Sequence, residues 1–323
     1  MPHRLLYLSR ADVERVALDM GTIIRLLDTA FREKGEGRVE MPPKPGVHPR
    51  PDAFIHAMPA YVPALRAAGL KWVSGFPENQ ARGLPYISGL IIINDDDTGL
   101  PIAVMDCTWI TGHRTGAATA LAARHLARPD SGAVAILGCG LQGRTNLLAL
   151  AELFSLTRVY AYDVSRDAEQ RYIAEMSKTL GLEVVGVTAP RDAVVAADLV
   201  VTCGPILKQP HATIHADWLQ PGAFASAVDY DSYWSPGALA QIDKIATDDR
   251  PQFDYYRQIG YFQRTPPPYA SLDEIVTGRK PGREHDEERT MAMNLGLAID
   301  DMAVAPEVHR RATEMKIGTW LEL

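Results

Sequence analysis

The stretch AVAILGCGLQGRTNLLALAELFSLTRVYAYD, residues 133–163, decides the fold of this chain. Residues 133–137 form a short apolar run with the length and bulk of a buried parallel strand. The pattern GxGxxG follows at residues 138–143, and apolar residues then recur at helical spacing up to Phe154. A second apolar run, residues 159–162, ends on an aspartate. Strand, glycine-rich turn, helix and strand in this order predict a Rossmann unit that binds a dinucleotide.

Each glycine of the turn has its own physical task. Gly138 permits the tight turn from strand to helix, Gly140 lets a pyrophosphate approach the backbone, and Gly143 lets the helix pack close to the sheet. Leu141 and Gln142 complete the turn, where the exposed N–H groups at the start of the helix favour a diphosphate. Taken alone, the motif is equally compatible with an ordinary turn, and it is the flanking elements that favour the cofactor site.

Asp163 indicates which dinucleotide is bound. It ends the second strand 25 residues after Gly138, where a carboxylate accepts hydrogen bonds from the ribose hydroxyls of the adenosine. The same carboxylate would repel the 2′-phosphate of NADP. Arg166 is the one contrary feature, since a guanidinium could cover that phosphate. The pattern therefore predicts NAD as the cofactor.

The composition argues against several classes of protein. The 323 residues are 46% hydrophobic and 23% charged, and the formal net charge of −7 is spread along the chain, so nothing indicates binding to nucleic acid or to an anionic membrane. Cys107, Cys139 and Cys203 lack metal-ligand spacing and indicate a reducing compartment. No apolar run approaches the ~18–20 residues of a membrane-spanning helix, and no signal-peptide pattern is present. We expect a cytoplasmic protein without a metal site.

The alternation of strands and helices continues from the Rossmann unit to about residue 247, which predicts a doubly wound parallel sheet. A chain of this length has room for two domains. We assign residues 129–291 to an NAD-binding Rossmann domain. Residues 1–128, together with the returning segment 292–323, form a second, discontinuous α+β domain. Its hairpin-rich segments are too small to bury both faces of their own sheet, which predicts a homodimer.

The first domain contains three segments of interest. Apolar residues recur at helical spacing over residues 10–34 and predict one helix. The proline-rich stretch 41–51 excludes a helix and carries Lys44, for which a solvated basic loop is the simplest reading. Lys71 interrupts an apolar strand next to Trp72. Such a lysine is either exposed at an edge or an inward-pointing ammonium of an active site, and the pattern leaves both open.

Two helical segments follow from the spacing of their residues. A helix rich in small residues is predicted over residues 111–127, with Arg114 and Thr115 near its start, where anions are favoured, and with a structural role for His113. Residues 289–315 predict another helix, broken at Pro306.

Two aspartates follow a predicted strand of the Rossmann domain, residues 223–228. Asp229 and Asp231 fall outside the carboxyl end of this strand, where α/β sheets bind their ligands. Their side chains would share a face if the strand continued unbroken. Mutual repulsion would then raise one pKa toward neutrality, and geometry alone does not separate the two groups.

Several motifs occur in one order along the chain, and together they resemble the ornithine cyclodeaminase/mu-crystallin family over nearly its full length. They are FIHAMPAY (54–61), GLK (69–71), TGHRTGA (111–117), GCGLQG (138–143), AVDYDS (227–232) and NLGLAIDD (294–301). No single motif is specific, but the conjunction is. KPGVHPR (44–50) and KWVSGFPENQ (71–80) are also similar to a subgroup that is labelled as one of the subunits of a tyramine oxidase.

The resemblance implies roles for single residues. Lys71 matches the active-site lysine of the family. Arg114 matches the arginine that binds the substrate carboxylate next to the cofactor, and Thr115 and Val228 lie beside the cofactor. The family pattern AVxxDS puts the catalytic aspartate at Asp231.

Two positions depart from the family pattern. Lys44 falls roughly where the family has a second carboxylate-binding arginine, and a lysine cannot form the bidentate fork. Asp229 stands where the family has a small residue. Both departures argue against assuming ornithine as the substrate.

The resemblance also implies the architecture and the chemistry. The first domain would bind the substrate and form the homodimer, and NAD⁺ would accept a hydride from the α-carbon of an amino acid while Asp231 moves protons at the amine. The net reaction is then cyclodeamination with ammonia release, amino acid dehydrogenation or ketimine reduction. A non-catalytic nicotinamide-nucleotide-binding protein of the crystallin type and an accessory subunit of an amine oxidase system are the alternatives. Lys71, Arg114 and Asp231 together favour an enzyme.

Overall fold

The computed structural model describes residues 3–50 and 53–323, so Pro51 of the predicted loop lies outside the described residues. The chain divides into two compact units, Met1–Arg114 with Leu297–Leu323, and Thr115–Gly296. Residues 115–128 and 292–296 therefore belong to the second unit, although the sequence placed them in the first domain. None of the helices in the described residues is long and apolar enough to span a membrane.

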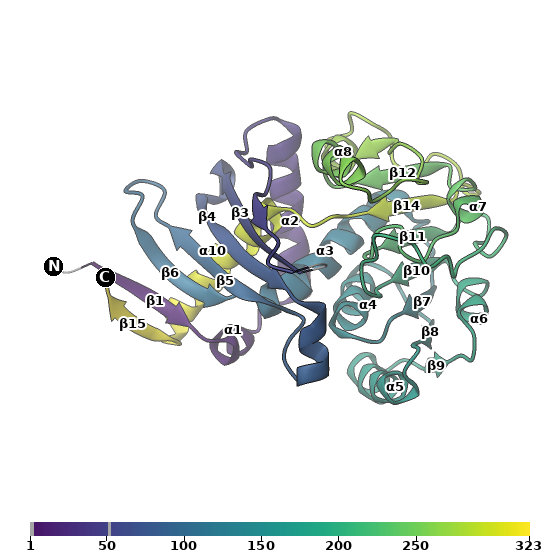
Figure 1. Cartoon of the computed structure of the whole chain (residues 1–323), viewed down its shortest axis with the longest axis horizontal. Helices are drawn as coiled ribbons and strands as arrows, with labels where there is room; N and C mark the ends of the chain where they lie inside the picture. The colour runs from purple at the N-terminus through teal and green to yellow at the C-terminus, as the bar shows by residue number, and fades with distance from the viewer. Residues whose placement is uncertain (1–2, 51–52) are drawn as a thin grey trace. The chain divides into compact units, whose positions relative to one another are not determined.

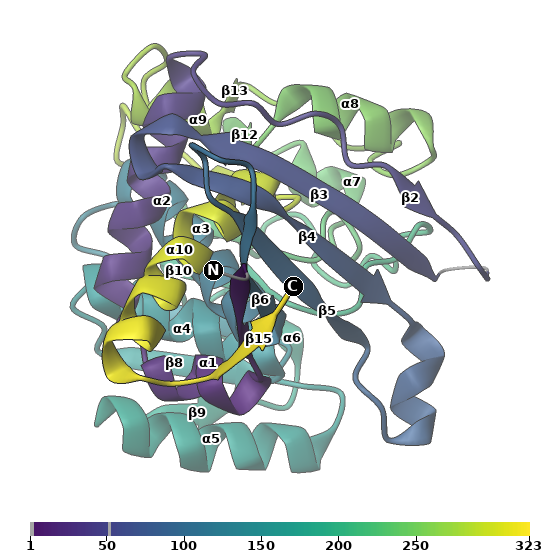
Figure 2. The same cartoon turned by 90° about the vertical axis from the view of Figure 1, so that its left-hand side faces the viewer.

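The first unit is built on a mixed sheet, in which the described strands follow the order β15-β1-β6-β5-β4-β3-β2 (Figures 1 and 2). Neighbouring strands run antiparallel except for the parallel pair β1 and β6. The hairpin of β5 and β6 lies where the sequence predicted it. The bounds of the strands are β1 Arg4–Leu8, β2 Gly46–Val47, β3 Phe54–Val62, β4 Ala67–Gly75, β5 Ile87–Asn94, β6 Pro101–Asp106 and β15 Thr319–Glu322.

The helix predicted over residues 10–34 is in fact two helices, α1 (Arg10–Val16) and α2 (Met20–Gly35). Ala17 ends α1 in the left-handed conformation with φ 47°. Asp19 then begins α2, because its Oδ1 accepts a hydrogen bond of 2.7 Å from the N–H of Thr22. The prediction of one helix was wrong, because the helical spacing of the apolar residues hid this cap. Two short 3₁₀ turns, Pro63–Leu65 and Pro77–Arg82, complete the local structure of the unit.

The long helix α10 (Ala298–Met315) runs behind the central strands of this sheet (Figure 2). Pro306 lies inside α10, and the predicted break at this proline was wrong. A proline inside a helix costs about 3 kcal/mol through the lost hydrogen bond and the ring clash. Burial offsets that loss, because Ala298–Ala305 are all buried and so are Val308 and Ala312.

The second unit contains a fully parallel sheet, in which the described strands follow the order β13-β12-β14-β11-β10-β7-β8-β9. The predicted doubly wound Rossmann sheet is confirmed. Its strands are β7 Ala133–Leu137, β8 Arg158–Tyr162, β9 Val184–Gly186, β10 Leu199–Thr202, β11 Phe224–Ala227, β12 Lys244–Thr247, β13 Ala270–Ser271 and β14 Thr290–Met293.

Helices cover both faces of the parallel sheet, with α4 on one side and α6 and α7 on the other (Figure 1). Helix α3 (Thr108–Leu126) spans the boundary of the two units. The other helices of the unit are α4 Leu141–Leu153, α5 Arg166–Leu180, α6 Pro190–Val194, α7 Pro236–Leu239, α8 Arg250–Gln258 and α9 Leu272–Val276. Ser165 caps α5 as expected, because its Oγ accepts from the N–H of Ala168 at 3.3 Å.

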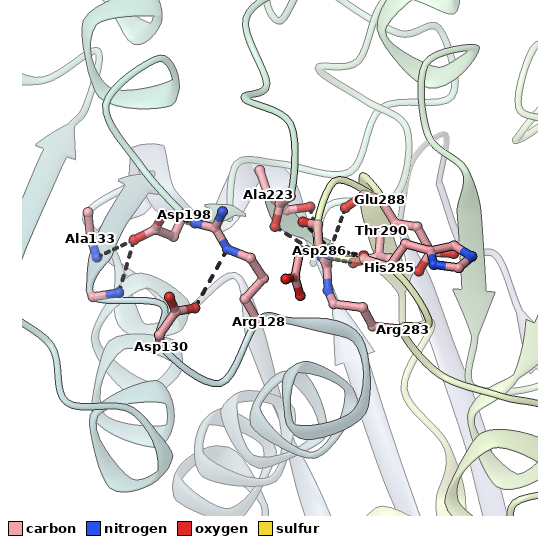
Figure 3. A network of polar contacts seen from close by, with 12 residues as sticks. Arg128, Asp130, Ala133, Asp198, Ala223, Arg283, His285, Asp286, Glu288 and Thr290 are labelled. Atoms are coloured by element: carbon pink, nitrogen blue, oxygen red, sulfur yellow. Dashed lines mark hydrogen bonds and ion pairs between the residues drawn. The ribbon is translucent and has the colours of Figure 1, made fainter.

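Strand β14 lies in the interior of the parallel sheet, between β11 and β12, where the sequence predicted a helix. Arg283 anchors the loop that leads into it (Figure 3). The Arg283 guanidinium donates to the carbonyl oxygens of Gly222 (3.0 Å) and Glu288 (2.6 Å) and to Thr290 Oγ1 (3.2 Å). Because one side chain satisfies several carbonyl groups, the irregular loop ends in register with the sheet.

Candidate active site

The three motif glycines occupy positions that match their expected tasks. Gly138 has φ 109°, and a Cβ there would lie 2.7 Å from the carbonyl oxygen of Cys203. A Cβ at Gly143 would collide with the carbonyl oxygen of Gly138. A Cβ at Gly140 would meet no heavy atom within 4 Å. Gly138 and Gly143 are thus required by the packing of β7 and α4, whereas Gly140 leaves open space.

This open space lies at the N-terminus of α4. Gly140 is the N-cap and contributes no side-chain cap, so the N–H groups of Leu141, Gln142 and Gly143 in the first turn remain available for an anion. The Leu141 side chain is 44% exposed. The residues present fit the diphosphate of a dinucleotide.

Asp163 is held next to this turn. Its Oδ2 accepts a hydrogen bond from the N–H of Cys139 (2.7 Å), and its Oδ1 accepts one from the N–H of Ser165 (2.8 Å). Each carboxylate oxygen keeps a further lone pair for a ribose hydroxyl. Arg166, the feature that spoke for NADP, is paired with buried Glu169 at 3.0 Å. The local contacts of both side chains favour a ribose with a free 2′-hydroxyl.

The remaining residues that we expected near the cofactor are less informative. Thr115 is half-buried inside α3, which begins at Thr108 and not at residue 111 as predicted. Arg114 and Thr115 are therefore not at the helix start, and the expected attraction of that terminus for anions does not apply to them. Val228 follows β11 and is half-buried, with its N–H donating to the carbonyl oxygen of Thr202 at 3.0 Å.

The first unit contains a buried cluster of two cations and two carboxylates. Lys71 Nζ lies 2.6 Å from Asp301 Oδ2. Arg114 Nη1 lies 3.2 Å from Asp300 Oδ2, and Arg114 Nε lies 3.3 Å from Asp301 Oδ1. Lys71 is 1% exposed and Arg114 6%, while both aspartates are fully buried. Lys71 therefore points inward, as one of the two alternatives had it.

Two cations face two carboxylates in this cluster, so the formal charges balance. Burying either cation without an anionic partner would be costly. Burial lowers the pKa of Lys71, the carboxylate of Asp301 opposes that shift, and the neighbouring charge of Arg114 adds to it. Asp300 and Asp301 were not assigned a role from the sequence. The signal was present, since two adjacent acidic residues stand in the otherwise apolar segment NLGLAIDDM (294–302).

Lys44 lies close enough to His56 to affect its charge, and His113 contacts Trp109. Burial, together with the positive charges of Lys44 and His48, lowers the pKa of His56 to about 4. His113 stacks on Trp109 at 3.8 Å between ring centroids, and its Nδ1 lies 2.8 Å from the Trp109 carbonyl oxygen. These contacts suit the structural role predicted for His113.

Asp229 and Asp231 do not lie on a continued strand. Strand β11 ends at Ala227, and Tyr230 has φ 65°, so the chain turns and the alternation of side chains no longer applies. Asp229 Oδ1 accepts from Thr202 Oγ1 (2.6 Å), and its Oδ2 accepts from the N–H of Gly204 (2.8 Å). Asp229 therefore ties the end of β11 to the end of β10.

Asp231 has different partners. Its Oδ2 accepts from Thr265 Oγ1 at 2.9 Å, whereas its Oδ1 has no hydrogen-bond partner in the described part of the chain. Burial raises the pKa of Asp229 to about 7, with the charge of Asp231 as a minor cause. Burial also raises the pKa of Asp231. The raised pKa that we expected from mutual repulsion arises chiefly from desolvation.

Metal chemistry receives no support from the arrangement. Across residues 3–50 and 53–323, no three His, Cys, Asp or Glu side chains come together in a group that could hold a metal ion.

Several known proteins are similar to this chain over nearly its whole length. Alanine dehydrogenase of Archaeoglobus fulgidus is 33% identical over 97% of both chains. N-((2S)-2-amino-2-carboxyethyl)-L-glutamate dehydrogenase of Staphylococcus aureus is 31% identical over the full length of both. Among solved structures, Δ1-pyrroline-2-carboxylate reductase of Thermococcus litoralis, in complex with NADH and L-proline, superposes with a TM-score of 0.88 at 31% identity, covering 98% of this chain and 99% of that one.

Two further structures are similar over almost the full length. An archaeal alanine dehydrogenase dimer with bound NAD has a TM-score of 0.88 and 32% identity, covering 99% of this chain and 100% of that one. A lysine cyclodeaminase has a TM-score of 0.84 and 26% identity, covering 99% and 96%. The model of the ornithine cyclodeaminase/mu-crystallin family matches residues 5–316, and the chain belongs to this family.

Proposed function

We propose that this protein is an NAD(H)-dependent enzyme that interconverts an α-amino acid and its α-imino acid by hydride transfer at the α-carbon. The observation that carries the proposal is the buried cluster of Lys71, Arg114, Asp300 and Asp301. The opposing carboxylates hold the two cations in fixed positions, which would orient them for the carboxylate of a substrate. A guanidinium offers that carboxylate two parallel hydrogen bonds, and Lys71 adds a point charge.

The second unit would hold the nucleotide. The open space at Gly140 and the N–H groups of the first turn of α4 would receive the diphosphate, and Asp163 would bind the adenosine ribose. Bound NAD⁺ accepts the hydride of the α-carbon, and NADH returns it in the reverse direction. NAD-bound relatives support this assignment of the cofactor.

Asp231 is our candidate for the proton-transfer group at the amine. One of its oxygens is oriented by Thr265, and the other lacks a partner in the described part of the chain. Burial raises the pKa of Asp231, and a raised pKa brings a carboxylate closer to the value that general acid–base catalysis needs near neutral pH. Asp229 is fully engaged with β10 and is assigned a structural role.

Net oxidoreduction is favoured over cyclodeamination. Two alanine dehydrogenases, the S. aureus dehydrogenase and the T. litoralis reductase are 31–33% identical to this chain, whereas the lysine cyclodeaminase is 26% identical. The buried cluster suits either reaction, so the choice rests on these relatives.

A paired assay tests the proposal. NADH oxidation is followed with 2-oxo acids plus ammonium and with cyclic imino acids, while ammonia release from diamino acids is measured in parallel. We expect a change in NADH absorbance with at least one imine, and a loss of about a hundredfold in kcat for Asp231→Asn with unchanged NADH affinity. Asp167→Asn, an exposed aspartate on α5, is the matched control. Ammonia release without net NADH turnover would instead identify a cyclodeaminase.

A homodimer and a cytoplasmic location complete the proposal. The sheet of the first unit exposes large apolar side chains, with Trp72 46% and Leu90 42% exposed. These two residues are paired across β4 and β5, on the face opposite to Lys71. An apolar sheet face of this kind suits a second copy, and a relative has been solved as a dimer. Light scattering should give twice the mass of the chain, and a monomer at micromolar concentration would contradict it. The three cysteines are unpaired, which supports a reducing compartment.

A further inference from the structure

The glycine-rich turn of residues 138–143 is contacted by a side chain that the motif itself does not include. Arg144, the residue directly after the motif, reaches back onto the turn. Its Nη1 donates to the carbonyl oxygens of Cys139 (2.5 Å) and Gly140 (3.0 Å). All of these residues belong to the second unit. One guanidinium nitrogen therefore holds two consecutive peptide groups of the turn.

The orientation of these two peptide groups determines where their N–H groups point. Both peptide bonds are trans, and in a trans peptide the C=O and N–H groups point in opposite directions. The N–H groups of Gly140 and Leu141 therefore face away from the Arg144 guanidinium. Gly140 borders the open space at the N-terminus of α4 that suits a diphosphate. Arg144 thus fixes, from the carbonyl side, the direction of donors that a diphosphate needs.

Helix α5 holds Arg144 in this position. The Nε of Arg144 donates to Glu175 Oε2 at 2.8 Å, and its guanidinium lies over the ring of Tyr172, 5.3 Å from the ring centroid. Tyr172 is fully buried, and its hydroxyl donates to the carbonyl oxygen of Gly143 at 3.1 Å. Tyr172 and Glu175 are three residues apart on α5 and so share one face of the helix. We name Arg144, Tyr172 and Glu175 the α5 brace.

The charge of Arg144 is a weaker candidate for the effect than its geometry. Glu175 pairs with Arg144, so the formal charges of the two side chains cancel. The Arg144 side chain is 23% exposed and that of Glu175 53%, so water and salt screen what remains of their field. The hydrogen bonds to the turn are short-ranged and charge-assisted, and they are unaffected by this cancellation.

Building on the cofactor site of the proposed function, we propose that Arg144 is a positioning residue for the diphosphate of the dinucleotide. It acts through the carbonyl groups of Cys139 and Gly140, and Glu175 and Tyr172 hold it in place. The α5 brace orders the turn before the cofactor binds. A turn released from the brace has to be ordered by the ligand, and the affinity falls by the cost of that ordering.

The first test compares ADP-ribose with adenosine on the full-length protein. Both ligands carry the base and a ribose, but only ADP-ribose carries the diphosphate. Calorimetry measures ADP-ribose, and ligand-observed NMR measures the weaker adenosine. Arg144→Met removes the donors and keeps an aliphatic stem; we expect it to bind ADP-ribose at least tenfold more weakly and adenosine within about twofold of the wild type. Arg171→Met, an exposed arginine of α5, is the control and should bind both ligands normally.

A matched pair of variants at Glu175 separates geometry from charge. Glu175→Gln and Glu175→Met remove the same negative charge, but only glutamine keeps an oxygen that can accept from Arg144 Nε. The brace predicts that Glu175→Gln binds ADP-ribose like the wild type and that Glu175→Met binds it about threefold more weakly. If Arg144 acted by attracting the diphosphate, both variants would bind ADP-ribose more tightly, because its charge would no longer be neutralised.

The outcomes separate this inference from the proposed function. Undiminished ADP-ribose affinity of Arg144→Met overturns the brace, and so does tighter binding by both Glu175 variants. Equal losses for ADP-ribose and adenosine also overturn it, because they indicate a general disturbance of the fold. In each case the wild type still binds the cofactor, and the proposed function stands. A wild type that binds ADP-ribose but reduces no imine refutes the proposed function and leaves the brace to be decided by the same variants. A wild type that binds neither ADP-ribose nor NADH overturns both.

Discussion

Asp229 gives a prediction about stability that the structure allows to be worked out in detail. The residue is 1% exposed, and burial raises its pKa from the ordinary value of 3.8 to about 7. Between these two values the folded protein retains a proton that the unfolded chain has already released. Stability must therefore fall as the pH rises from about 4 to about 7, and it should change little through this group at higher pH. At about 1.4 kcal/mol per pK unit, the expected loss over this range is about 4 kcal/mol.

Asp229→Asn removes the titration and preserves both contacts. The amide oxygen can still accept from the N–H of Gly204, and the amide nitrogen can donate to Thr202 Oγ1. The variant should gain stability over the wild type as the pH rises from 4.5 to 7.5, by an amount that approaches the same few kcal/mol. Denaturant unfolding in a pH series measures the difference, with the exposed Asp254→Asn as the control that follows the wild type. Parallel curves for Asp229→Asn and the wild type would refute the reasoning.

Three further substitutions test the cofactor site and the buried cluster. Gly140→Val should weaken NADH binding at least tenfold with little change in Tm, because the added side chain meets only open space; calorimetry that finds undiminished affinity would remove Gly140 from the site. Lys71→Met leaves the carboxylate of Asp301 buried without its nearest cation, and it should lower the free energy of unfolding by about 3–5 kcal/mol as well as abolish turnover; an unchanged Tm would show that the pair is dispensable for folding. Asp163→Ala should narrow the difference in affinity between NADH and NADPH, and tighter NADPH binding by the wild type itself would contradict the assignment of NAD.

The Rossmann unit was predictable because its signals are local. A buried strand, a turn that tolerates only glycine at Gly138 and Gly143, and a helix follow one another within some twenty residues, and Asp163 marks the end of the next strand. The backbone clashes at these two glycines are the physical reason why the motif carries so much information.

The elements that were missed depend on distant partners. Strand β14 has four residues that are all buried, so it lacks the alternation that would separate a strand from a helix, and β11 and β12 determine its conformation. Helix α10 continues through Pro306 because its burial outweighs one lost hydrogen bond. Asp301 stands out in the sequence as an acidic residue in an apolar segment, but its partner Lys71, more than two hundred residues away in the chain, is identified only by the fold.

Hydride transfer to an imino acid is tested most directly with NADH that carries deuterium at the transferable C4 position. The protein is incubated with this NADH, a panel of 2-oxo acids with ammonium, and cyclic imino acids, and the products are analysed by mass spectrometry. We expect an amino acid that is heavier by one deuterium, located at its α-carbon, and we expect Asp231→Asn to form it about a hundred times more slowly. NADH that binds in a calorimeter but transfers no deuterium to any member of the panel would contradict an imine-reducing enzyme and would leave a nucleotide-binding protein.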